Sequence, residues 1–318
     1  MNGGFEFEKP MIELEQKIEG LKKLAETGTV DVASEITSLQ KKLEAVRKDT
    51  YGNLTPWQRV LIARHPQRPY TLDYVRLVME EFIELAGDRL FANDLAIVTG
   101  LARMDGRTLA VIGHQKGRDT KENLMRNFGS AHPEGYRKAN RIMKMAEKFN
   151  FPVVSFIDTP GAYPGIGAEE RGQAEAIAFN LRTMAALRTP IVVVIIGEGG
   201  SGGALGIGVG DEVMMLENCY YSVISPEGCA AILWKNQGKA PEAASTLRIS
   251  PKELLEMGVI DRIIPEPLGG AHRNYELAAR EVKRALAESL GRLTRIPVEE
   301  LVNRRYGKYR VMGSFTEE

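Results

Sequence analysis

A stretch of twenty residues from Ile191 to Gly210, IVVVIIGEGGSGGALGIGVG, constrains the fold more than any other part of the chain. It begins with six apolar residues and no polar alternation, a pattern typical of a strand buried on both faces of a parallel sheet. Eight of the fourteen residues from Gly197 to Gly210 are glycine, which is a poor helix and strand former. We therefore expect the backbone here to approach a ligand or another backbone very closely.

A second segment of the same kind lies upstream. The segment VVSFID (153–158) predicts another buried strand, TPGAYPG (159–165) predicts a turn, and residues 168–187 predict a helix. A buried strand followed by a glycine turn and a helix gathers free backbone N–H groups at one point, where negative charge is stabilised. The alternative is that both turns serve only tight packing.

Composition excludes several classes of function. The chain has 318 residues and a formal net charge of zero, so no overall charge favours nucleic acid or a membrane surface as partner. No apolar run is long enough to cross a bilayer, and the acidic start MNGGFEFEKP does not suit a signal peptide. Two cysteines indicate a reducing cytoplasm, and the four histidines lack ligand spacing, so we expect no metal.

The order of predicted elements indicates an α/β fold with helices at both ends. We expect an N-terminal helical arm and linker helices over 1–90, an α/β core over 91–270 and C-terminal helices over 271–318. Apolar spacing predicts a helical hairpin over 11–48, broken near Thr27, and a helix over 71–85 that ends at Gly87. Asp105-Gly106 predicts a β-hairpin between 97–104 and 108–113.

The same patterns predict the other strands and helices of the chain. Short apolar runs predict strands, and helical periodicity after prolines or capping residues predicts helices. The expected strands are 213–216, 220–224 and 261–264, and the expected helices are 133–149, 226–234, 238–260 with a break at Ser250-Pro251, 274–290, and one that begins at Pro297.

The polar loop after the second hairpin strand is a candidate binding element. It contains His114, Lys116 and Arg118, and basic residues outnumber acidic ones from there to Lys148. These side chains would attract an anionic group or an acidic partner. The alternative is a solvated helix and loop surface.

Four interpretations compete for the glycine-rich turn. It is not a phosphate loop, because no Lys-Ser/Thr pair closes it, and no acidic residue ends a following strand as a dinucleotide fingerprint requires. Gly199-Gly-Ser-Gly-Gly203 matches the Gly-x-Ser-x-Gly elbow of hydrolases, which would also need His114 or His132 near Ser201. The fourth interpretation is an oxyanion hole built from backbone N–H groups.

Long motifs carry a specific resemblance that extends over nearly the whole chain. These motifs are HQKGRDTKEN (114–123), RNFGSAHPEGYRKA (126–139), DTPGAYPG (158–165), GEGGSGGAL (197–205), YSVISPEGCA (221–230), IIPEPLGGAHRN (263–274) and NRRY (303–306). In these segments the chain resembles the alpha-subunit family of the bacterial acetyl-CoA carboxylase carboxyltransferase, whose carboxyltransferase domain would span about residues 35–295.

The resemblance implies a crotonase-like fold of repeated ββα units. It also implies an activity: transfer of a carboxyl group from carboxybiotin, held on a biotin carboxyl carrier protein, to acetyl-CoA, giving malonyl-CoA for fatty acid synthesis. In that family ATP is used by a separate biotin carboxylase. The alpha subunit offers the biotin side, and a beta subunit with a zinc ribbon offers the acetyl-CoA side of an α2β2 heterotetramer. We therefore expect this chain to be inactive alone.

The resemblance and the charge chemistry together give candidate residues. As carboxybiotin loses its carboxyl group, negative charge develops on the ureido oxygen, and the thioester enolate needs the same stabilisation. We expect Gly202 and Gly203 to form the hole, with Gly161 and Ala162 as the second candidate pair. The expected biotin-side residues are Gly199, Gly200, Ser201, Tyr163, His114, Lys116 and Arg118.

Other residues near the turns have less direct roles. We expect Glu198 to be a buried, paired carboxylate that orients the loop, in preference to a general base. Gly206, Gly208 and Gly210 are expected to be close-packing residues, and Tyr163 and Tyr221 to be either core or pocket wall. Two alternatives stay open: a homo-oligomeric hydratase, isomerase or serine peptidase, and a structural subunit whose turns only pack against a partner.

Overall fold

A mixed eight-stranded sheet forms the centre of the molecule. The computed structural model describes residues 5–26 and 32–313. The strand order is β1-β2-β3-β4-β5-β6-β8, and β7 pairs with β5 beside this path. The strands are β1 (Glu80–Glu84), β2 (Ile97–Met104), β3 (Arg107–His114), β4 (Val153–Thr159), β5 (Ile191–Gly200), β6 (Glu212–Leu216), β7 (Tyr220–Ser222) and β8 (Arg262–Ile264).

Strands β4 and β5 are the most deeply buried part of the sheet. Every residue of both strands is buried, and they pair in parallel with each other and with β3 and β6. This confirms the prediction that both are buried strands, since a strand covered on both faces needs no polar alternation. Because the strands are parallel, their carboxyl ends and the glycine turns that follow lie at one edge of the sheet.

β5 is longer than its main partners and changes partner along its length. Its first half pairs with β6 from Val192 to Ile195, and its last three residues pair with β7 from Glu198 to Gly200. The segment that enters the glycine-rich turn is therefore held between β4 on one side and β7 on the other.

The β2–β3 hairpin is confirmed, and an additional strand precedes it. Asp105 and Gly106 both have positive φ, 51° and 77°, as a tight two-residue hairpin turn requires. The predicted helix over 71–85 is wrong in its second half: α4 ends at Val78, and β1 pairs antiparallel with β2. Because this charged edge strand is stabilised by pairing across the sheet, its helical spacing was misleading.

The helices cover both faces of the sheet and extend beyond it. The α-helices are α1 (Lys9–Glu26), α2 (Ala33–Gly52), α3 (Pro56–Ala63), α4 (Thr71–Val78), α5 (Thr120–Met125), α6 (Pro133–Phe149), α7 (Ile166–Glu170), α8 (Gln173–Ala186), α9 (Ser201–Leu205), α10 (Pro226–Trp234), α11 (Ala240–Thr246), α12 (Pro251–Glu256), α13 (Tyr275–Leu293) and α14 (Val298–Arg310). Single 3-10 turns are η1 (Glu6–Glu8), η2 (Asn127–Gly129), η3 (Gln237–Lys239) and η4 (Ala271–Arg273). In the described ranges, no helix is both long and apolar enough to span a membrane.

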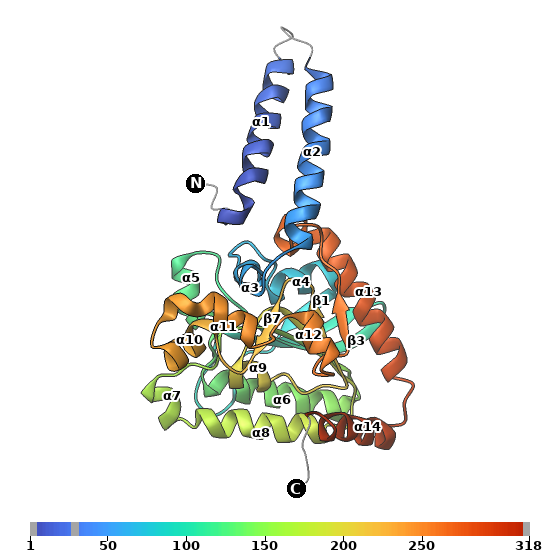
Figure 1. Ribbon diagram of the computed structural model, residues 1–318. Helices are drawn as coiled ribbons and strands as arrows, with labels where there is room; N and C mark the ends of the chain where they lie inside the picture. The colour runs from blue at the N-terminus through green and yellow to red at the C-terminus, as the bar shows by residue number, and fades with distance from the viewer. Residues whose placement is uncertain (1–4, 27–31, 314–318) are drawn as a thin grey trace.

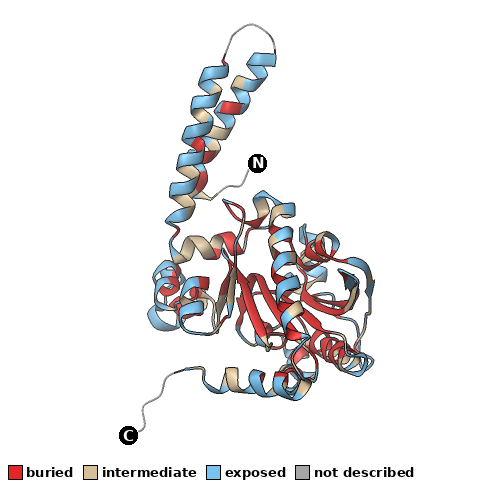
Figure 2. Ribbon diagram, turned by 90° about the vertical axis from the view of Figure 1, so that its right-hand side faces the viewer, coloured by how far each residue is buried: buried red, intermediate tan, exposed pale blue. Residues whose placement is uncertain are grey.

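Helices α1 and α2 form an arm that projects from the body (Figure 1). Met11, Ile18 and Leu43 are buried between the two helices, while most of the arm is exposed (Figure 2). The predicted hairpin is thus observed, and its predicted break near Thr27 lies outside the described residues. The segment 1–90, expected to be helical, also contains β1, so the sheet begins before the boundary we placed at residue 91.

Two predicted helices are each interrupted. The helix expected over 168–187 is divided at Gly172, whose φ of 82° is left-handed, into α7 and α8. The helix expected over 238–260 consists of η3, α11 and α12, and the chain between Thr246 and Ser250 leaves the helix to line a pocket. The strand expected over 220–224 is shorter and ends at Ser222.

Candidate active site

The two glycine turns meet, backbone against backbone, beyond the carboxyl ends of β4 and β5. Thr159 at the end of β4 is paired with Gly199 at the end of β5. A Cβ on Gly203 would stand 2.5 Å from the Ala162 nitrogen, and one on Gly200 would collide with the Pro160 carbonyl. Gly203 and Gly200 therefore have no room for a side chain because the other turn occupies it.

Gly202 differs from these neighbours. A Cβ at this position would meet only the Ile177 Cδ1 atom, at 3.7 Å, among the described atoms. Gly202 and Gly203 occupy the second and third positions of α9, and N–H groups in a first helical turn have no intrahelical acceptor. Close packing therefore explains Gly203 but does not explain the missing side chain of Gly202.

The two residues of the second candidate pair, Gly161 and Ala162, differ in whether their backbone N–H group is already used. The Gly161 N–H donates to the Thr159 hydroxyl at 3.1 Å, so this donor is already used inside its own turn. Ala162, the next residue, has its nitrogen beside Gly203. Of the two, Ala162 is the one available to act with the α9 turn.

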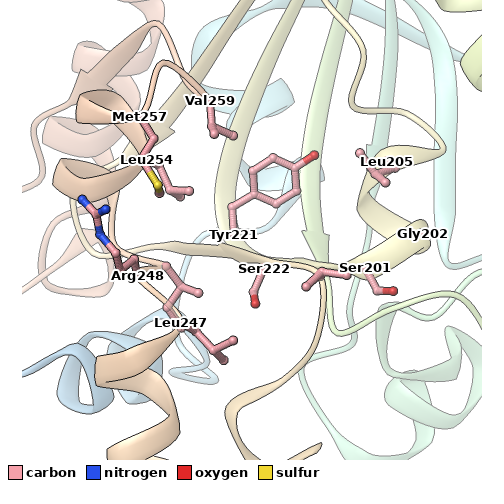
Figure 3. A pocket seen from close by; sticks show the side chains of 12 residues that line it. Ser201, Gly202, Leu205, Tyr221, Ser222, Leu247, Arg248, Leu254, Met257 and Val259 are labelled. Carbon is pink, nitrogen blue, oxygen red and sulfur yellow. The ribbon is translucent and has the colours of Figure 1, made fainter. Parts of the chain in front are cut away.

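A largely apolar pocket of about 440 Å³ opens beside the α9 turn (Figure 3). One side consists of Ser201, Gly202 and Leu205, and β7 contributes Tyr221 and Ser222. The opposite side comes from the segment around α12. Its lining residues there are Leu247, Arg248, Ile249, Leu254, Met257 and Val259, and Val223 completes the wall.

The aromatic wall of this pocket is fixed by the glycine-rich strand. A Cβ on Gly199 would stand 2.7 Å from the Tyr221 ring, so the ring packs directly on the strand backbone. Burial raises the pKa of the Tyr221 hydroxyl above its usual value, which keeps the group neutral. Of the two open roles for Tyr221, the structure shows the pocket wall.

A group of largely enclosed charged and polar side chains lies where the two turns begin. We call it the Lys116 cluster, and its members are Lys116, Asp158, Glu198, Arg64 and Tyr220. The Lys116 Nζ atom is 2.7 Å from Asp158 Oδ1 and 2.8 Å from Glu198 Oε1. The other Glu198 oxygen accepts hydrogen bonds from Arg64 Nε at 2.7 Å and from the Tyr220 hydroxyl at 2.6 Å. Glu198 is thus a buried, paired carboxylate, as predicted.

The protonation states of the cluster follow from these contacts. Burial alone would raise the pKa of Glu198, but Lys116 and Arg64 outweigh burial and lower it to about 2. Burial alone would lower the pKa of Lys116, but Asp158 and Glu198 outweigh it and raise the value above its usual range. Glu198 is therefore ionised and hydrogen-bonded at neutral pH, and it is not available as a general base.

The loop residues predicted to meet biotin or its carrier have three different environments. Lys116 points inward into the cluster. His114 is fully buried beside the backbone of Gly203 and Phe156, and burial lowers its pKa to about 3, so it does not line a surface. Arg118 is partly exposed, but its guanidinium lies over the Tyr70 ring at 4.0 Å and donates to the Arg68 carbonyl at 2.8 Å.

Tyr163 from the first turn stacks on His132, with ring centroids 4.1 Å apart. The His132 backbone N–H donates to the buried Asp94 carboxylate at 2.7 Å. Ligand atoms of Asp94, His132 and Glu134 lie within 4.8 Å of one another, but Arg171 donates to Glu134 Oε1 at 2.6 Å and its charge opposes a cation there. This group is better described as an internal ion-pair network.

The geometry argues against a serine hydrolase. Ser201 is exposed at the sharp strand-to-helix turn with φ of 50°, which is the backbone expected of a nucleophile elbow. In the described part of the chain, however, no histidine or carboxylate lies within hydrogen-bond distance of its hydroxyl. His114, one of the two candidate bases, is buried.

Several residues that shape the site were not identified from the sequence. The α12 side of the pocket and Arg64 come from segments distant in sequence from the glycine turns. Asp158 was assigned only to the end of a buried strand. The sequence did hold one indication that Asp158 needs a partner: it is the one charged residue of a buried strand.

Comparison with known proteins agrees with the geometry. Residues 4–313 match the family model described as acetyl co-enzyme A carboxylase carboxyltransferase-like. The acetyl-coenzyme A carboxylase carboxyl transferase subunit alpha of Bordetella avium is 57% identical over 316 residues, covering 99% of this chain and 98% of that protein. The subunit of the same name from Geobacter metallireducens is 57% identical over 312 residues, covering 98% of each chain.

Solved structures with much lower identity share the fold. The transcarboxylase 12S core, with methylmalonyl-coenzyme A bound, superposes with a TM-score of 0.56 at 19% identity, covering 70% of this chain and 42% of that one. A Pseudomonas malonate decarboxylase hetero-dimer superposes with a TM-score of 0.55 at 17% identity, covering 68% and 88%. The fold is therefore the crotonase-like α/β fold of carboxyltransferases, and the full-length matches show that this chain belongs to the acetyl co-enzyme A carboxylase carboxyltransferase family, with the alpha subunits.

Proposed function

We propose that this chain, together with a beta subunit, transfers a carboxyl group from carboxybiotin to acetyl-CoA and yields malonyl-CoA. In this reaction bound carboxybiotin supplies the carboxyl group, and negative charge develops on the ureido oxygen of biotin and on the thioester oxygen. The task of this chain is to stabilise such charge with backbone N–H groups of Gly202 and Gly203. Fixed donors of this kind act without a titrating side chain.

The open position at Gly202 is the observation that carries this proposal. Gly202 lines the pocket beside a free first helical turn, and packing against the protein does not require it to be glycine. A substrate oxygen that must come close to the N–H group gives a reason for the missing side chain. Ala162, whose nitrogen lies beside Gly203, is our candidate for an additional donor in the same hole.

The adjoining pocket fits the fused ring and aliphatic chain of biotin. Its walls are mainly Leu, Ile, Val, Met and Tyr side chains, and Arg248 is its charged member. A neutral, largely apolar group gains from burial in such a pocket. We therefore assign the biotin side of the reaction to this pocket, with Ser201 at its edge; Gly199 and Gly200 act by allowing close packing.

The proposed partners follow from the family. The beta subunit would supply the acetyl-CoA side in an α2β2 assembly. The biotin carboxyl carrier protein would deliver carboxybiotin, which a separate biotin carboxylase makes with ATP. This division gives the chain no complete active site of its own. We propose a cytoplasmic enzyme, with neither nucleic acid nor a membrane as partner.

The experiment that tests the proposal is a transfer assay with and without the partner. Transfer between malonyl-CoA and biocytin is measured for this chain alone, for the beta subunit alone and for the purified complex. We expect turnover only in the complex. Turnover by this chain alone would favour a complete hydratase-like or hydrolase-like site, and an inactive but fully assembled complex would refute the proposed reaction.

A further inference from the structure

We infer that Lys116 is a positioning residue, which holds the two glycine turns in the arrangement that carboxyl transfer needs, and is not a ligand of biotin or its carrier. This inference rests on the proposed function of the turns. It replaces the role we expected for Lys116 from the sequence.

Lys116 connects the ends of two neighbouring strands. Its ammonium group lies 2.7 Å from Asp158, which precedes the turn at 159–165, and 2.8 Å from Glu198, which precedes the glycine-rich turn at 199–203. Its side chain is 12% exposed, and those of Asp158 and Glu198 are 3% and 8% exposed. One cation therefore fixes the distance between the two points from which the turns depart.

The same connection is reinforced by the backbone. The Glu198 N–H donates to Asp158 Oδ1 at 3.0 Å, the oxygen that also binds Lys116. A side chain on Gly197 would collide with the Asp158 carboxylate. Gly129 also packs on Lys116, since a Cβ added at Gly129 would stand 3.0 Å from the Lys116 Cγ atom. Contacts with both strand ends and with Gly129 therefore hold Lys116 in place.

The charge of Lys116 bears directly on the proposed chemistry. Arg64 pairs with Glu198 and also with Glu227, so it already serves two carboxylates. Without Lys116, Asp158 and Glu198 would lose the cation that they share. Both carboxylates lie just before the turns whose N–H groups are proposed to bind the oxyanion. Uncompensated buried carboxylates repel such an oxyanion and each other. Loss of Lys116 should therefore weaken transition-state stabilisation more than substrate binding.

The hydrogen bonds leave Lys116 poorly suited to bind substrate. Two of its three N–H donors are occupied by carboxylates, and the group is almost fully enclosed. Binding an anionic carrier would require breaking a buried ion pair. A positioning role, in contrast, requires only the contacts that Lys116 makes with Asp158 and Glu198.

The test is Lys116→Met in the complex with the beta subunit, which removes the charge and keeps an unbranched chain. We expect kcat for transfer between malonyl-CoA and biocytin to fall about 10- to 100-fold, while both KM values stay within about twofold, because misplaced groups cost turnover before binding. Wild-type complex is assayed in parallel. If the wild-type complex is inactive, the proposed function fails, whereas a normal wild type with an unaffected variant refutes only this inference.

A matched control distinguishes positioning from general stability. Arg305 is fully buried and pairs with Asp211 at 2.9 and 2.7 Å, but it lies near the amino ends of β5 and β6, at the opposite edge of the sheet. Arg305→Met should lower the unfolding temperature and leave kcat unchanged below it. If Lys116→Met behaves in the same way, or raises a KM at constant kcat, the inference is wrong.

A second variant tests the same inference if Lys116→Met does not fold. Glu198→Gln keeps the size of the side chain and its contacts with Arg64 and Tyr220, but weakens the tie to Lys116. We expect it to assemble and to show the same selective fall in kcat. A folded, assembled Glu198→Gln complex with wild-type kcat would overturn the inference.

Discussion

The α-carbon of Gly203 faces the main chain of Ala162 so closely that a Cβ at position 203 would stand 2.5 Å from the Ala162 nitrogen. The two glycine turns therefore shape each other. Gly203→Ala should destabilise the protein by about 1–3 kcal/mol, because an added methyl group must displace backbone. Gly202→Ala should leave stability within about 0.5 kcal/mol of wild type, because the site is open. Chemical denaturation of both variants measures this, and equal losses would contradict it.

Removing the Gly202 N–H group tests the proposed hole directly. Proline is tolerated in a first helical turn and lacks the donor, so Gly202→Pro keeps α9 while it deletes one hydrogen bond to the oxyanion. We expect kcat of the complex to fall about 100- to 1000-fold relative to Gly202→Ala. The two variants are compared under conditions in which both are folded, because proline also restricts the backbone conformation of the preceding residue, Ser201. Equal kcat for the two variants would exclude Gly202 as a donor.

Filling the apolar pocket tests its assignment to biotin. Leu254 lines the pocket, and its neighbour Leu255 is 40% exposed and does not line it. Leu254→Phe should raise the KM for biocytin about tenfold, the equivalent of about 1.4 kcal/mol, because the larger ring occupies the space of the ligand. Leu255→Phe is the matched control and should change neither KM. A rise in the KM for malonyl-CoA instead would assign the pocket to the acyl-CoA.

Elements encoded by local patterns were predicted from the sequence, and elements that depend on distant partners were not. The continuous apolar run that begins at Ile191 sufficed for β5, and Asp105-Gly106 sufficed for the β2–β3 hairpin, because strand burial and turn type are expressed within a few residues. β1 was missed because its stability comes from pairing with β2, about 20 residues further along the chain.

The candidate site divides in the same way. The glycine spacing identified both turns, and the usual behaviour of a buried carboxylate predicted that Glu198 is paired. Neither revealed that Arg64, 134 positions earlier, is one of its partners. Basic loop residues appear alike in a sequence, although Lys116 is enclosed and Arg118 is partly exposed. Only the fold shows that Lys116 is the side chain that turns inward, because its partners Asp158 and Glu198 come from strands β4 and β5, which follow later in the chain.

The stacked histidines near the base of the arm predict how stability depends on pH. His272 lies on His65 with ring centroids 3.9 Å apart, and burial, followed by the charge of His65, lowers the pKa of His272 to about 3. An unfolded histidine titrates near pH 6.5. Between these values the unfolded state binds more protons than the folded state, so the contribution of His272 is complete above pH 6.5 and is lost as the pH falls toward 3.

His272→Phe removes this titration and keeps a ring that can stack on His65. Arg68 and Arg273 also disfavour the protonated ring, and Glu266 opposes them only in part, so the neighbouring charges do not reverse the expected sign. We expect the free energy of unfolding of wild type to fall more steeply between pH 7 and pH 5 than that of His272→Phe, as measured by urea denaturation. Parallel pH profiles would show that the buried ring is protonated without cost. His272 would then contribute nothing to the acid sensitivity of the protein.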